Sequence, residues 1–139
     1  MTINEIQDQI IDDFSYFDDW MDKYEYIIDL GKNLPLIDES QKTDEKLISG
    51  CQSRVWLGVD HKEGKVEFTA DSDAVITKGI IGLLIQVMSN QPAKEIVESD
   101  LYFIDKIGLK EHLSPTRSNG LLSMVKQMKM YAVALNLIK

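Results

Sequence analysis

The chain has 139 residues, of which 44% are hydrophobic and 27% are charged, and its formal net charge is -8. This size and composition predict one domain that buries a hydrophobic core without disulfides or metals. The acidic balance argues against nucleic-acid binding, which requires clustered lysine and arginine. We find neither an apolar run long enough to span a membrane nor an export signal, so we expect a cytoplasmic protein with no membrane partner.

The negative charge is concentrated at the start of the chain. Residues 1–45 carry 13 acidic and 3 basic side chains, a net charge of -10, whereas residues 46–139 carry 10 acidic and 12 basic side chains, a net charge of +2. An acidic segment of this kind is typical of solvated helix faces. It also suits a surface that docks onto a basic patch of a partner protein.

Apolar residues at helical spacing predict two helices, or one bent helix, within residues 1–31. Thr2 and Glu5 have the spacing of a capping box at the first helix start. Asp18 and Asp19 precede the second apolar series and are suited to cap or restart a helix. Gly31 follows that series, where a left-handed glycine often ends a helix. Residues 32–46 are polar and predict a surface loop.

The hydrophobic period then changes from helical to alternating. Val55, Leu57 and Val59 alternate with other residues, as in a strand with one buried face. Residues 61–65 contain a glycine and predict a turn, and residues 66–70 predict the second strand of an antiparallel hairpin. Two strands are marginally stable in water, so helices are expected to cover one face of the hairpin.

The rest of the chain is predicted to be helical. Asp71, Ser72 and Asp73 are placed to cap a long apolar helix that extends to about residue 88. Pro92 and Pro115 are expected to start two further helices, and a short helical segment over residues 101–107 should end at the glycine that follows it. Strands enclosed by helices from both ends of the chain predict an α+β fold, a compact single domain with a small antiparallel sheet covered by helices.

Cys51 is the only cysteine. A single thiol forms no internal disulfide, and with His61 and His112 far away in sequence it falls short of the four ligands of a structural zinc site, so no metal site is predicted. The sequence leaves open whether His112 folds back onto Cys51 and acts as its base, although no protease signature surrounds the cysteine. The simplest alternative is that Cys51 fills the core as a small hydrophobe.

The neighbours of Cys51 favour a reactive thiol. Gly50 removes bulk beside the sulfur and permits unusual backbone angles. Gln52, Ser53 and Arg54 supply polar groups that can hold a sulfur anion or a substrate, and nearby positive charge favours the thiolate form. We therefore expect a nucleophilic sulfur on a flexible tip before a strand.

Three segments, in this order and at this spacing, resemble the SufE family of sulfur acceptors: GCQSRVW at 50–56, ADSDAVITKGI at 70–80 and HLSPTRSNGLLSM at 112–124. The resemblance extends over nearly the whole chain. It implies a single SufE-like domain over residues 1–139, with a fold like that of the scaffold protein IscU. Thr116 departs from the serine often found in the family, but both residues carry a hydroxyl.

The resemblance also implies a function. Family members act beside a pyridoxal-phosphate cysteine desulfurase in iron–sulfur cluster assembly. The protein is then expected to accept persulfide sulfur from a SufS-like desulfurase, to stimulate that enzyme, and to deliver sulfur to a SufBCD-like cluster scaffold. It needs no cofactor of its own, because the pyridoxal phosphate belongs to the partner. CsdE-type paralogues share these motifs, so both pathways fit the sequence.

By motif, the acceptor is Cys51, and the candidates for loop control and partner contact are Gly50, Gln52, Ser53, Asp73 and Arg117. In the family the loop tucks its sulfur into an apolar pocket and swings out on docking, so Val55 and Ile80 are expected near that pocket. Asp73 is expected to cap its helix and to tether the loop. Arg117 is expected either to pair with an acidic group or to lie near the cysteine.

Two other functions compete with sulfur transfer. A non-catalytic adaptor would bind a desulfurase and leave Cys51 dispensable. A scaffold that binds iron directly would need several soft ligands, and one cysteine per chain is too few unless subunits share them.

Overall fold

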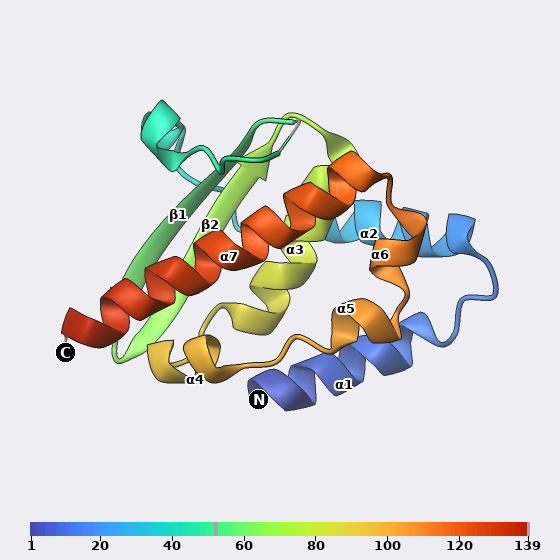
Figure 1. Cartoon of the computed structure of the whole chain (residues 1–139), viewed down its shortest axis with the longest axis horizontal. Helices are drawn as coiled ribbons and strands as arrows, with labels where there is room; N and C mark the ends of the chain where they lie inside the picture. Colours follow the sequence, from blue (N-terminus) through green and yellow to red (C-terminus); the bar gives the residue numbers. More distant parts are fainter. Residues whose placement is uncertain (52, 139) are drawn as a thin grey trace.

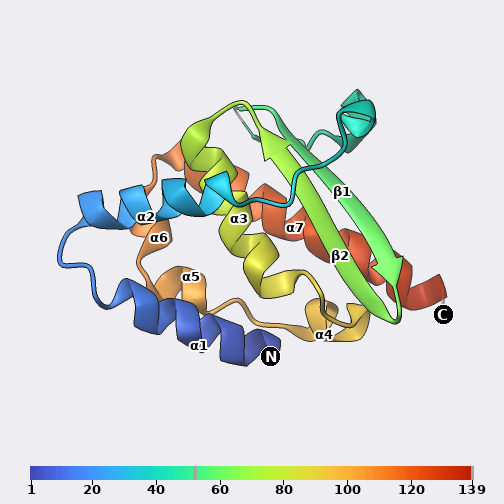
Figure 2. The ribbon, with the colours of Figure 1, turned by 180° about the vertical axis from the view of Figure 1, so that it is seen from behind.

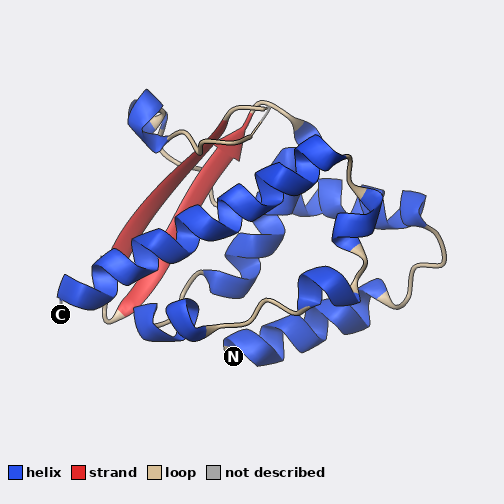
Figure 3. Cartoon of the chain, viewed as in Figure 1, coloured by secondary structure: helices blue, strands red, loops and turns tan. Residues whose placement is uncertain are grey.

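The structure, a computed structural model, describes residues 1–51 and 53–138 (Figure 1). Its helices and strands, coloured by type in Figure 3, form the α+β arrangement predicted from the sequence. They are α1 (Ile3–Phe14), α2 (Trp20–Lys32), β1 (Val55–Lys62), β2 (Lys65–Ser72), α3 (Val75–Met88), α4 (Ala93–Glu98), α5 (Phe103–Lys106), α6 (Leu109–His112) and α7 (Pro115–Ile138), with short 3-10 turns η1 (Glu39–Gln41) and η2 (Asp44–Lys46).

Helix α3 is the centre of the fold. Opposite views show it between α2 and α7, beside the hairpin (Figures 1 and 2). A helix covered on several sides must be apolar nearly all round, and this explains its sequence. The buried residues of α3 are Thr77, Gly79, Ile80, Ile81, Leu83, Leu84, Ile85, Val87 and Met88.

No helix in the described part of the chain is long and apolar enough to cross a membrane.

The predicted hairpin is confirmed. Strand β1 pairs antiparallel with β2, from Val55 opposite Ser72 to Lys62 opposite Lys65. The two turn residues, Glu63 and Gly64, both have positive φ, at 53° and 79°. This backbone matches the strand twist in two-residue hairpin loops and favours glycine at the second position.

The predicted start signals of the first two helices are also confirmed. The Thr2 Oγ1 accepts the amide of Glu5 at 3.1 Å, and the Glu5 carboxylate accepts the amide of Thr2 at 2.9 Å. The Asp19 carboxylate accepts the amide of Asp22 at 2.9 Å and caps α2. These side chains satisfy amides that the helices leave without partners.

The prediction that Gly31 ends α2 is wrong. The helix continues to Lys32, and Gly31 packs on Gly79 where α2 crosses α3. A Cβ at Gly31 would lie 2.9 Å from the amide nitrogen of Gly79, and a Cβ at Gly79 would lie 2.7 Å from Cγ2 of Ile27. Gly31 is therefore present because two helix backbones approach closely, not because a helix ends there.

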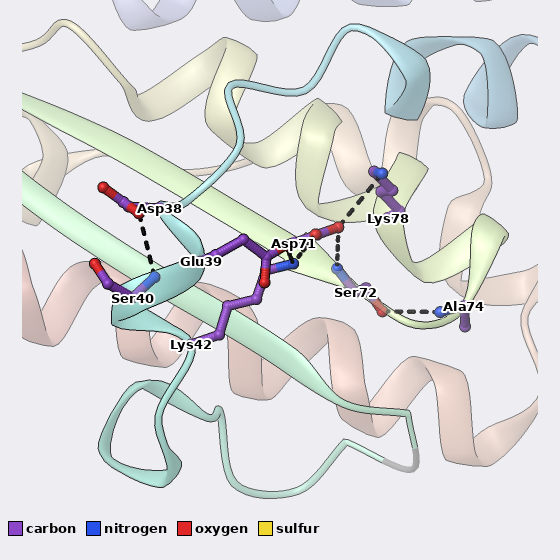
Figure 4. A network of polar contacts seen from close by, with 8 residues as sticks. All are labelled: Asp38, Glu39, Ser40, Lys42, Asp71, Ser72, Ala74 and Lys78. Atoms are coloured by element: carbon purple, nitrogen blue, oxygen red, sulfur yellow. Dashed lines mark hydrogen bonds and ion pairs between the residues drawn. The ribbon is translucent and has the colours of Figure 1, made fainter.

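The predicted capping of α3 by Asp71 and Asp73 is wrong as well. The helix is preceded by Ala74, whose amide is accepted at 3.2 Å by the Ser72 hydroxyl. Asp71 lies in β2, between Lys42 at 2.5 Å and Lys78 at 3.3 Å (Figure 4). Its carboxylate thus joins the segment before Cys51 to the hairpin and to α3.

The second half of the chain differs from its prediction at two points. Pro92 is expected to be the first residue of a helix, but it is the residue before α4, which begins at Ala93. Pro115 is the first residue of α7, as predicted. Gly108, with φ of 74°, follows α5 and precedes α6, a helix of four residues that the sequence pattern did not indicate. So short a helix has less than two turns over which a hydrophobic period can repeat.

Candidate functional site

Cys51 lies on the loop between η2 and β1, and its half-buried thiol faces α7. The thiol is a weak donor to the carbonyl oxygen of Gly120, with Sγ and oxygen 3.7 Å apart. A Cβ at Gly120 would lie 3.5 Å from this sulfur. The absence of a side chain at Gly120 therefore lets the cysteine loop approach the helix backbone.

Gly50 packs on the next turn of the same helix. Its φ is +89°, and a Cβ on it would lie 2.5 Å from the Ser123 Oγ. Both the left-handed backbone and the close approach require glycine at this position. Successive turns of α7 thus hold Gly50 and Cys51.

Asp73 fastens the other end of the loop. Its carboxylate oxygen accepts the amide of Arg54 at 3.1 Å, and its own amide donates to the Arg54 carbonyl at 3.3 Å. The tether expected of Asp73 is therefore present, whereas the helix cap expected of the same residue is not. The loop that carries Cys51 is anchored by α7 on one side and by the β2–α3 connection on the other.

Replacing Asp73 with alanine should release the loop. The substitution removes one of the two hydrogen bonds to Arg54, and because Asp73 is exposed we expect a stability loss of only about 1 kcal/mol. We expect Cys51 to react several-fold faster with iodoacetamide at neutral pH, measured by intact mass against time. Asp12→Ala, at an exposed position of α1, is the matched control and should leave the rate unchanged. Equal rates in both variants would mean that the tether does not restrain the thiol.

A small cavity of about 70 Å³ adjoins the thiol. Thr77, Ile80, Gly120 and Met124 are buried and form its floor, whereas the other lining side chains are more exposed and form its rim. Ile80 lies here as expected, but Val55 is not among the lining residues. The pocket expected from the resemblance is apolar, whereas this lining includes three hydroxyls and a guanidinium. The residues that line the cavity are Cys51, Ser53, Thr77, Ile80, Thr116, Arg117, Gly120 and Met124.

Burial raises the pKa of the Cys51 thiol above its ordinary value. The prediction that neighbouring cations favour the thiolate is wrong for this conformation, because loss of hydration disfavours the charged form. Arg117 lies at the cavity rim with its side chain exposed, and none of the ion pairs among the described residues includes it. The inward-facing thiol is therefore protonated and a weak nucleophile at neutral pH.

The raised pKa gives a pH dependence with a definite sign. Alkylation of folded Cys51 should rise with pH through a midpoint above that of the same thiol in the urea-unfolded chain. The native state prefers the neutral thiol, so this contribution to the free energy of unfolding is complete below the unfolded pKa of about 8.5 and is lost as pH rises through the folded pKa. Coincident midpoints in the two states would contradict burial of the thiol.

His112 is not the base of a Cys51 nucleophile in this arrangement. Its ring stacks on Trp20, with ring centroids 4.0 Å apart, and its Nδ1 lies 2.9 Å from the carbonyl oxygen of Gly108. His112 is absent from the cavity lining. Within residues 1–51 and 53–138, no three histidine, cysteine, aspartate or glutamate side chains converge as metal ligands would.

The structure brings most of the sequence-selected residues together. Gly50, Ser53 and Arg117 lie beside Cys51, and Asp73 tethers its loop through Arg54. Gln52, also selected, lies outside the described residues. Thr77, Gly120 and Met124 also lie beside the thiol, and the sequence pattern did not indicate them. The one signal for Thr77 is a hydroxyl on a buried face of a helix that is otherwise almost wholly apolar.

Comparison with known proteins now settles the family. A model of the SufE family, described as an Fe–S metabolism associated domain, matches residues 8–132. The chain belongs to the SufE family. Two relatives, uncharacterized SufE-like proteins of Rhizobium etli and Rhizobium meliloti, are 48% and 46% identical to it over 128 residues. These matches cover 88% of this chain and 86% and 91% of the relatives.

A solved structure shares the fold of this chain. The solution structure of a hypothetical protein from Thermus thermophilus matches with a TM-score of 0.77 at 18% identity, over 93% of this chain and 94% of that one. Family membership associates the protein with iron–sulfur metabolism. It also confirms the resemblance that the three sequence segments indicated.

Proposed function

We propose that the protein accepts sulfur from a cysteine desulfurase on Cys51 and passes it to an iron–sulfur cluster scaffold. One observation carries the proposal: the only cysteine of a SufE-family chain lies on a loop with few anchors, beside a cavity that has room for an added atom. A free thiol that serves as a carrier belongs in a reducing compartment, so we place the reaction in the cytoplasm.

The transfer is an exchange between sulfurs that needs no added oxidant. The Cys51 thiolate attacks the outer sulfur of a persulfide on the desulfurase, the donor S–S bond breaks, and a new S–S bond forms on Cys51. The donor cysteine leaves as a thiolate and takes up the proton that Cys51 lost. The desulfurase is thereby freed for another turnover, which accounts for its stimulation. In the delivery step, a scaffold thiolate attacks the outer sulfur of the Cys51 persulfide, and Cys51 leaves as a thiolate.

The anchors of the loop give this reaction a resting state. Facing α7, the thiol is half buried and its pKa is raised. Docking to a desulfurase that displaces the contacts to Gly120 and Asp73 exposes the sulfur and removes the cause of the raised pKa. The Cys51 thiol then becomes a better nucleophile only in the complex, where the donor persulfide is present.

The test uses a purified SufS-type desulfurase with its pyridoxal phosphate, free cysteine and the whole chain, without reductant. Intact mass should show one added sulfur on this protein, and alanine formation by the desulfurase should rise. A stimulated desulfurase beside an accessory protein of unchanged mass would contradict sulfur transfer and support the adaptor function.

A further inference from the structure

Three polar side chains are buried in the described part of the chain: Gln7, Thr77 and Gln91. The amide of Gln7 donates to the carbonyl oxygen of Asp100 at 3.0 Å, and that of Gln91 donates to the carbonyl oxygen of Met1 at 2.9 Å. Thr77, which is only 7% exposed, forms no side-chain hydrogen bond with another described residue, and it lines the cavity beside Cys51. The buried side-chain atom without a partner in the described part of the chain is the Trp20 Nε1, so the Thr77 hydroxyl is not an orphaned core atom.

The Thr77 side chain belongs to the floor of the Cys51 cavity. Thr77 lies in the first turn of α3, and the other floor residues, Ile80, Gly120 and Met124, have no side-chain N–H or O–H to donate. The floor therefore contains one buried side-chain donor beside the only thiol of the chain. A hydroxyl rotates freely and can donate to an atom placed in the cavity.

The hydroxyls and the cation at the rim are weaker candidates for this role. Thr116 and Arg117 are exposed and Ser53 is half-buried. Water competes with an added atom for exposed donors, whereas a donor in a low-dielectric floor keeps the full strength of its hydrogen bond. Among the groups around Cys51, Thr77 gains most from a new acceptor.

We infer that Thr77 is a positioning residue that donates a hydrogen bond to the terminal sulfur of a Cys51 persulfide and holds that sulfur inside the cavity. The inference rests on the proposed function. A water-sized atom needs about 10–15 Å³, so the cavity of about 70 Å³ admits one further sulfur but not a bulky thiol such as glutathione. Hydrogen bonds to an anionic acceptor are the strong ones, and the bond to Thr77 therefore favours the anionic persulfide.

The experiment loads the persulfide without a desulfurase. Hydrogen disulfide anion reacts with the thiol to give the persulfide and hydrosulfide: Cys51–SH and HSS⁻ become Cys51–SSH and HS⁻. Cyanide then removes the outer sulfur as thiocyanate, which restores the thiol, and the release of thiocyanate reports how accessible that sulfur is. Wild type is compared with Thr77→Val, which removes the donor at similar volume, and with Thr77→Ser, which keeps it.

We expect Thr77→Val to lose its sulfur to cyanide about tenfold faster than wild type, the rate equivalent of one hydrogen bond to a charged atom. The pH midpoint for alkylation of the persulfide should also rise in Thr77→Val, because the anion loses its donor. Thr77→Ser should remain close to wild type in both measurements. Thermal melting checks that the variants fold, and Thr77→Ala repeats the test should valine disturb the cavity.

Equal cyanide rates and equal alkylation midpoints in wild type and in the folded variants without the hydroxyl would overturn the inference. Chemical loading separates this failure from failure of the proposed function. A wild-type protein that shelters a chemically loaded sulfur through Thr77, but gains none from a desulfurase, would support the role of Thr77 and contradict the proposed donor.

Discussion

Replacing Cys51 with serine should abolish sulfur transfer completely. A hydroxyl does not form a persulfide under these conditions, and no other cysteine in the chain can substitute for the lost thiol. Intact mass after incubation with desulfurase and cysteine should show no added sulfur, and desulfurase turnover should fall to the level of the enzyme alone. The substitution changes one atom at a half-buried position, so the thermal melting temperature should change little.

The matched control for Cys51→Ser is Ser49→Ala, an exposed position on the same loop that does not line the cavity. It should accept sulfur and stimulate the desulfurase as wild type does. If the Cys51→Ser variant still stimulated the desulfurase fully, the protein would be an adaptor and the carrier function would be excluded. If that variant still relayed sulfur to a scaffold, the acceptor atom would have been misassigned.

Gly79→Ala should be the most destabilising single methyl addition in the helical core. The new Cβ would lie 2.7 Å from Ile27 Cγ2 and 2.8 Å from the Ile27 backbone carbon, and closer still to the Ile27 carbonyl oxygen. Backbone atoms cannot rotate away as a side chain does, so α2 and α3 must separate. Overpacking costs about 1–3 kcal/mol and occasionally more, and alanine returns about 1 kcal/mol of helix propensity. We expect a net loss of about 2 kcal/mol in the free energy of unfolding.

The same helix provides the control. A Cβ at Gly82 would have its nearest contact at 3.6 Å, an ordinary van der Waals distance, so Gly82→Ala should be stabilised by up to about 1 kcal/mol. Thermal or urea unfolding measures both, and Gly79→Ala should melt about 7 °C below wild type. Equal stability of the two variants would show that the helices adjust their crossing at little cost.

The local elements followed from the sequence because their signals are local. Alternating apolar residues and a glycine turn specify the hairpin, and the Thr2–Glu5 capping box specifies the start of α1. The three sequence segments also indicate the family without any coordinates, and the first of them contains Cys51, the proposed sulfur carrier. The hairpin and capping signals, and each segment taken singly, depend on residues a few positions apart, whose relative geometry is largely fixed by local structure.

The predictions are wrong where one residue type serves two purposes. Glycine often ends helices, but Gly31 permits the crossing of α2 with α3. Aspartate often caps helices, but Asp71 pairs with Lys42 and Lys78. The sequence states that a small or acidic residue is present and does not state which distant element lies against it.

The sequence by itself determined the α+β class, the family and the thiol. Only the tertiary structure decided that the thiol faces Gly120, that Asp73 tethers its loop, and that Thr77 forms the floor of the cavity. Residues 51, 77 and 120 are far apart in the chain and meet because the packing of α3 and α7 brings them together. Contacts between residues so far apart in sequence depend on how whole helices pack in the core, and no local sequence pattern specifies them.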